Sequence, residues 1–242
     1  MKPQYVKLCF DEQWEAGQNV FPQVTLHPSY SRKQAGSVYK LTKQNFRHFA
    51  LDTTSFRLRE GASLLHIMEP VFCLSGLVVH HDIFDILIQY KLPPHRFFPF
   101  SLEGEDYYLL FVAMDLLENT IFPHSHIYTQ NGLREEQKVH LNNRIEYDRL
   151  ARAARDFHRD EAAMTDHARM PKPGKHEQLT QLRKNGISFY GYRSLTLDAS
   201  ARKWDVLHER RNFYFSPELA AALSSSPAKG IQFVQTTRIN IL

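Results

Sequence analysis

Between Leu64 and Phe122 the chain is dense in apolar residues, which come in short runs separated by turn residues. The longest mostly apolar stretch, Val71 to Val79, is itself broken by a Ser-Gly pair. Short apolar runs between turn signals are typical of buried strands. None approaches the roughly 18 apolar residues that a membrane-spanning helix needs. The region therefore predicts strands in a globular core and no membrane span.

Two stretches, 78–100 and 213–234, share one order of features: a β-prone run, a capping residue, a short helix, a break and a second β-prone run. In the first stretch, Asp82 is expected to cap a helix over residues 83–90. In the second, Ser216 followed by proline predicts a helix start. Two copies of one strand–helix–strand unit would explain this similarity, and so would chance, because such units are common.

The segment 133–170 carries eight Lys or Arg residues and eight Asp or Glu residues. Its apolar residues fall roughly on one helical stripe, which predicts one long amphipathic helix, or two, with a solvated charged face. After this segment, β-prone runs at 187–192, 194–198, 212–215 and 230–234 predict further strands.

These patterns predict an α+β fold with a mixed or mostly antiparallel sheet, flanking short helices and a charged helical insertion. The sheet is expected to combine residues 64–122 with residues 187–242. Residues 1–60 are irregular and predict an N-terminal arm or small lobe. Residues 61–242 form the predicted main domain, which carries the helical insertion 133–170.

Composition excludes several classes of protein. Thirty Lys and Arg against 26 Asp and Glu give a net charge of +4, which allows an acidic partner without requiring one. The cysteines, Cys9 and Cys73, are far apart and in no CxxC pattern, so a disulfide scaffold or zinc ribbon is not expected. The first ten residues lack the apolar core of a signal peptide, and we expect a cytoplasmic protein.

Histidine pairs suggest metal ligation. His80-His81-Asp82 and His124-Ser125-His126 supply suitable side chains, yet a site needs three or four ligands that converge. His80 and His81 are expected on opposite faces of a strand, and Asp82 as a helix cap, so no metal or cofactor is predicted. The chain lacks HExxH, GxSxG, P-loop and GxGxxG motifs.

Cys73 with His66 or His80 would make a nucleophile–base pair, but its apolar neighbours favour a place in the core. Paired carboxylates are expected to be solvated surface charges. The sequence therefore favours a protein that is not an enzyme.

Four arginines, Arg149, Arg152, Arg155 and Arg159, recur at helical spacing and would form a basic stripe for an acidic protein or nucleic acid. Neighbouring aspartates weaken the positive electrostatic potential of this stripe. The default interpretation is an exposed helix whose charged side chains form ion pairs with one another. No motif points to nucleic acid specifically.

Blocks of residues from about Leu77 onward occur in an order found in one known family. The blocks begin with Val78-Val79-His80, Asp82-Ile83-Phe84-Asp85-Ile86-Leu87, Pro94, Pro99-Phe100 and Tyr107-Tyr108-Leu109-Leu110. They continue with Met114-Asp115, Ser125, Ser194-Leu195-Thr196-Leu197-Asp198, Trp204-Asp205-Val206, Phe213-Tyr214-Phe215-Ser216, Leu219, Leu223 and Gly230-Ile231-Gln232-Phe233. In this order the chain resembles immunity protein family eleven of bacterial polymorphic toxin systems, over about two thirds of its length. The chain departs from the family pattern at His80-His81, where serine would be the simpler cap, and in the insertion 133–170.

The resemblance implies a cytoplasmic immunity protein that binds and neutralises a cognate toxin or effector protein, encoded next door, without an active site. We expect Arg149, Arg152, Arg155 and Arg159 in the insertion to contact it, because insertions on a shared scaffold are where partner choice varies. A basic chain favours a toxin that is acidic or near neutral where they touch. Two alternatives stay open: a metal-dependent hydrolase using the clustered histidines, and a nucleic-acid-binding module. Oligomeric state is also left open.

Overall fold

The computed structural model describes residues 5–10, 20, 22–73, 75–166, 168–209, 211–226, 228 and 231–242. Met1–Gln4, and Gly230 of the last predicted strand, lie outside these residues. The chain forms two compact units, described here one at a time: unit 1 comprises residues 1–116 and 200–236, and unit 2 comprises 117–199 and 237–242. The domain boundary expected at residue 60 stays a prediction. The compact units have other limits, at residues 116, 199 and 236.

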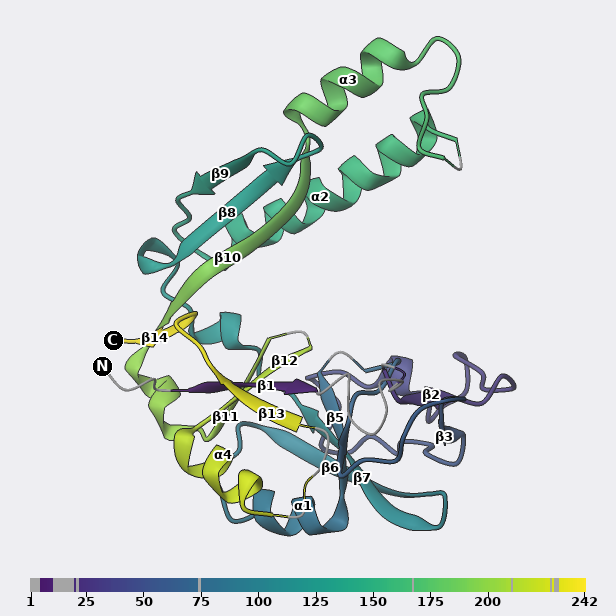
Figure 1. The fold of residues 1–242 in the computed structure, drawn as a ribbon, viewed down its shortest axis with the longest axis vertical. Helices are drawn as coiled ribbons and strands as arrows, with labels where there is room; N and C mark the ends of the chain where they lie inside the picture. The colour runs from purple at the N-terminus through teal and green to yellow at the C-terminus, as the bar shows by residue number, and fades with distance from the viewer. Residues whose placement is uncertain are drawn as a thin grey trace. The chain divides into compact units, whose positions relative to one another are not determined.

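Two four-stranded antiparallel sheets form the frame of unit 1 (Figure 1). Their strand orders are β4-β5-β7-β6 and β11-β12-β1-β13. In the first half the elements are β4 (Ile67–Met68), β5 (Gly76–His80), α1 (His81–Leu87), β6 (His95–Leu102) and β7 (Glu105–Val112). In the second they are β11 (Val206–Glu209), β12 (Asn212–Phe215), α4 (Pro217–Ser224), β13 (Ile231–Gln235) and β1 (Val6–Phe10). A two-stranded sheet, β2 (Val24–Leu26) with β3 (Phe56–Leu58), completes unit 1.

The two halves of unit 1 have the same topology. In each, a helix joins two strands that flank a third: α1 joins β5 to β6 around β7, and α4 joins β12 to β13 around β1. The middle strand β7 follows β6 by a tight turn, whereas β1 comes from the start of the chain. The helices α1 and α4 contact each other (Figure 1). The predicted strand–helix–strand order is therefore present in both stretches.

The sheet that contains β5 is buried on both faces. Successive side chains of β5 point to opposite sides of this sheet, and each side packs in a different core cluster. Leu77 and Val79 join one core cluster with residues of α1, α4 and the second sheet. Val78 joins another cluster with Val38 and Phe56 from the predicted N-terminal arm. Burial on both faces explains why this region reads as a nearly continuous apolar run.

The caps of the two helices differ from one another. As predicted, Ser216 caps α4, because its Oγ accepts a hydrogen bond from the backbone N–H of Leu219 at 3.3 Å. The prediction for Asp82 was wrong: α1 begins at His81, and His80 Nδ1 accepts from the Asp82 N–H at 3.4 Å. Strand β5 leads into the helix without a loop, so the cap falls on the last residue of the strand.

Unit 2 is a sheet of order β14-β10-β8-β9, with helix α2 packed on β10 and helix α3 packed on α2. Its elements are β8 (His126–Asn131), β9 (Glu136–Val139), α2 (Arg144–Met164), α3 (His176–Asn185), β10 (Ile187–Leu197) and β14 (Ile239–Ile241). In this sheet β14 pairs in parallel with β10, while β10 with β8 and β8 with β9 are antiparallel. Short 3-10 helices occupy Val38–Lys40, Leu116–Asn119, Phe122–His124 and Ala199–Lys203.

The α+β class and the mostly antiparallel pairing are confirmed, while several details differ from prediction. Residues 64–122 and 187–242 do not share a single sheet, because β10 pairs with β8 instead. The runs 187–192 and 194–198 merge into the single strand β10, which ends at Leu197 and whose register with β8 shifts between Tyr192 and Ser194. The charged segment is helical only from Arg144, since β9 precedes it. Within the described part of the chain, no helix is long and apolar enough to cross a lipid bilayer.

Candidate functional site

Helix α2 has one buried face that fixes its position on the sheet of unit 2. Tyr147, Ala154 and Phe157 are buried on that face. A β-carbon at Gly186 would lie 2.5 Å from the Phe157 ring, and one at Gly132 would lie 2.8 Å from it. Only glycine fits at these two positions, so the Phe157 ring is held between two backbone segments. The helix is therefore a firmly seated element rather than a loosely attached one.

The predicted arginine stripe lies on the opposite, exposed side of α2. Arg149, Arg152, Arg155 and Arg159 are all exposed. Arg159 pairs with Asp156 at 3.1 Å and with Asp160 at 3.2 Å. Within the described part of the chain, the other three guanidinium groups have no hydrogen-bond or ion-pair partner. Their charges and donors are therefore available to a partner molecule.

The N-terminus of α2 is capped by two neighbouring polar groups. Asn143 Oδ1 accepts from the Glu146 N–H at 3.1 Å, and the Glu146 carboxylate accepts from the Asn142 N–H at 2.7 Å. Reciprocal capping of this kind satisfies backbone donors that the first turn leaves unpaired. The stripe thus begins one turn into a helix whose start is fixed.

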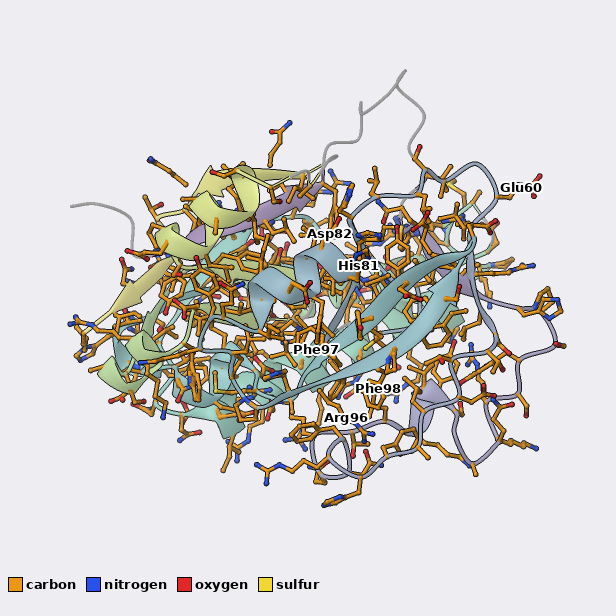
Figure 2. The ribbon with its side chains drawn as sticks, turned by 90° about the horizontal axis from the view of Figure 1, so that it is seen from below. Glu60, His81, Asp82, Arg96, Phe97 and Phe98 are labelled. Carbon is orange, nitrogen blue, oxygen red and sulfur yellow. The ribbon has the colours of Figure 1, made fainter. Side chains whose placement is uncertain are left out.

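A second candidate site, in unit 1, is a cluster of His66, His80 and Asp82. The ligand atoms of these three side chains all lie within 4.8 Å of one another. His66 precedes β4, His80 ends β5, and Asp82 lies in the first turn of α1, where Figure 2 labels it beside His81. The backbone N–H of His80 donates to the His66 carbonyl at 2.8 Å, so strand pairing brings the two imidazoles together.

Charged and aromatic groups surround His80. Its Nδ1 lies 3.3 Å from Asp82 Oδ2, and its Nε2 lies 3.8 Å from Glu105 Oε2. His81 Nε2 lies 3.0 Å from Asp82 Oδ1. The Tyr107 ring packs edge-on against His80 with centroids 5.2 Å apart. Burial, and secondarily the charge of Glu105, raises the pKa of Tyr107, so this neighbour is a neutral phenol.

The structure regroups the histidines that the sequence singled out. His80 and His81 belong to unit 1, and His124 and His126 to unit 2. Among the described residues, neither His124 nor His126 takes part in a group of three metal-ligating side chains. The expectation that His80 and His81 occupy opposite strand faces was wrong, because the helix starts between them and their ring centroids are 4.3 Å apart.

His66 is the member of this cluster that the metal interpretation of the sequence missed. The signal that would have found it is its position one residue before β4, whose Ile67 pairs with Val79. That register places His66 opposite His80, but a register between distant strands cannot be read from the sequence.

Cys73 is a core residue, as its apolar neighbours predicted. It is 8% exposed, and burial raises the pKa of its thiol to about 12. A thiol with such a pKa stays protonated near neutral pH and is a poor nucleophile.

No protein-family model matches this chain, and no curated protein or solved structure matches it. The roles of the residues above therefore rest on their geometry and chemistry.

Proposed function

We propose that this chain is a cytoplasmic immunity protein that neutralises a cognate bacterial toxin by stoichiometric binding through the exposed face of α2. The observation that carries the proposal is the row of Arg149, Arg152 and Arg155, exposed and unpartnered within the described part of the chain. The resemblance in residue order to immunity protein family eleven supports it.

Such a function needs a rigid surface rather than an active site. Binding is strongest where a few side chains, arginine often among them, are presented by an element that does not have to be ordered on association. The seated helix α2 meets that condition, because Phe157 is held between Gly132 and Gly186. Inhibition then follows from covering or distorting the toxin's own site.

Charge indicates the kind of toxin surface that fits. The guanidinium groups of Arg149, Arg152 and Arg155, unpartnered among the described residues, favour a facing patch rich in carboxylates, since Arg–carboxylate pairs are bidentate and directional. We therefore expect the contacted region of the toxin to be acidic or near neutral. Tight binding to a strongly basic nuclease through acidic residues of this chain would contradict that expectation.

The first experiment is co-purification with the product of the adjacent upstream reading frame, followed by a toxicity assay. A stable complex that abolishes toxicity supports the proposal. The absence of both a complex and a toxic neighbour contradicts it.

The second experiment reverses charge on the stripe with Arg149→Glu, Arg152→Glu and Arg155→Glu together. We expect at least a hundredfold loss of affinity for the toxin, because each lost charge pair at an interface typically costs more than about 1 kcal/mol. The matched control makes the same change at the exposed Lys33, Lys138 and Lys184 and should leave affinity nearly unchanged. Equal losses in both variants would indicate a long-range charge effect instead of a contact.

A nucleic-acid-binding function would give a different result in the same variants. Retention of the native chain on DNA or heparin would be strong and steeply salt-dependent. Both the stripe variant and the lysine control would then lose retention in proportion to charge.

A further inference from the structure

We propose that His66, His80 and Asp82 bind a divalent transition-metal ion of the zinc class, with solvent water completing its coordination. Two imidazoles and a carboxylate are ligands that such ions prefer. The site combines a firm anchor with access from solvent, because the His80 side chain is 11% exposed and that of Asp82 is 41% exposed. This inference concerns unit 1 and does not rest on the function proposed for α2.

The distances suit a tetrahedral ion. With bonds of about 2.0–2.1 Å, two ligand atoms of a tetrahedral zinc site lie roughly 3.4 Å apart. His80 Nδ1 and Asp82 Oδ2 are already 3.3 Å apart. The ligand atom of His66 lies within 4.8 Å of the other two, so its half-buried side chain has to move closer for all three groups to bind one ion.

The surroundings place a carboxylate near the far side of the His80 ring. His80 Nε2 lies 3.8 Å from Glu105 Oε2, so a small approach of the exposed Glu105 side chain would make the outer hydrogen bond once Nδ1 binds the ion. A carboxylate in this position fixes the tautomer and orientation of the ligating ring. His81 Nε2, at 3.0 Å from Asp82 Oδ1, can hold that oxygen and leave Oδ2 for the ion.

Without a cation, His80 Nδ1 faces two incompatible neighbours. As the helix cap it accepts from the Asp82 N–H at 3.4 Å and so carries a lone pair. The same atom lies 3.3 Å from the Asp82 carboxylate oxygen, which also carries lone pairs. A cation between these two electron-rich atoms relieves their repulsion.

The test uses the full chain, purified without a histidine tag, stripped with a chelator and titrated with Zn²⁺ against a chromophoric chelator. We expect one ion per chain, and with Co²⁺ the visible absorption of a four-coordinate site. His66→Ala and Asp82→Asn should each weaken Zn²⁺ binding more than a hundredfold. Glu105→Gln should weaken it about tenfold, as expected of an outer hydrogen-bond partner.

A double variant, His124→Ala with His126→Ala, is the matched control and should bind Zn²⁺ like the native chain. Asp82→Asn preserves the shape of the side chain, and circular dichroism of each variant verifies that it is folded. Absence of stoichiometric binding to the native chain would overturn the proposal. Loss of binding in the control, with retention in His66→Ala, would overturn it too.

Discussion

The helices α1 and α4 occupy equivalent places in the two halves of unit 1, yet they begin in different ways. Ser216 accepts from the Leu219 N–H and donates to Asp205 Oδ1 at 2.8 Å. His80 makes only a long cap bond, at 3.4 Å, and lies instead among His66, Asp82 and Glu105. Serine is a preferred cap and histidine is not. The difference indicates that the contacts of His80 with His66, Asp82 and Glu105, more than helix capping, account for a histidine at position 80.

The largest expected effect is the loss of stability when a buried leucine of either helix is truncated. It tests whether α1 and α4 contribute equally to the stability of the core they share. Leu87 of α1 and Leu223 of α4 are 1% and 0% exposed in the same cluster. Leu87→Ala and Leu223→Ala should each lower the free energy of unfolding by about 2 to 5 kcal/mol. Urea denaturation measures both values. A loss in one variant that is several times the other would show that the halves, though alike in topology, do not share the core evenly.

The next effect is stabilisation by Zn²⁺, which we expect to depend on the cap of α1, His80, and not on the cap of α4, Ser216. At free Zn²⁺ about 100 times its dissociation constant, the native chain should gain about 2.7 kcal/mol of stability. His80→Ser keeps a capping oxygen but removes a metal ligand, so this gain should vanish. Thermal unfolding with and without Zn²⁺ measures it. A gain that persists in His80→Ser would place the metal elsewhere.

Removing the serine cap should cost less. Ser216→Ala should lower the free energy of unfolding by about 1 kcal/mol, within the range of 0.5–2 for such caps. It also deprives Asp205 of one donor, while the Lys91 N–H continues to donate to the other oxygen at 2.8 Å. Denaturation at neutral pH measures the change, and Ser225→Ala, at the other end of α4, is the control with little expected effect.

The smallest effect is the loss of stability when the acidic residue in the first turn of α4 or of α1 is neutralised. Glu218→Gln and Asp82→Asn each remove a negative charge near a helix N-terminus, which is worth about 0.3–1 kcal/mol. Without metal the two losses should be similar. With Zn²⁺ present, only Asp82→Asn should lose the additional stabilisation, and an equal response of both variants would argue against Asp82 as a ligand.

Local features of the fold could be predicted from the sequence. Ser216 followed by proline identifies the start of α4, because a cap and its helix are neighbours in the chain. Asp82 resembled a cap for the same reason, and the prediction failed only because a strand ran directly into the helix.

Features set by distant pairing could not be predicted. The pairing of β10 with β8, instead of with a strand from residues 64–122, depends on which apolar faces meet in three dimensions. The meeting of His66 with His80 depends on the register of β4 with β5. The arginine stripe lies between these cases. Its exposure followed from helical spacing, but only the structure shows that Arg159 is paired while Arg149, Arg152 and Arg155 have no partner among the described residues.

The second sheet of unit 1 has a consequence for how the chain matures on the ribosome. Its central strand, β1, is synthesised early, but Val6 pairs with Phe215 and Gln235, which emerge only after most of the chain. Until then β1 has no neighbours, and its backbone groups are open to mispairing. The half formed by β4 to β7 is contiguous and can collapse during synthesis. The other half can close only once β12 and β13 have been made, and pairing between segments so distant in sequence is a slow step.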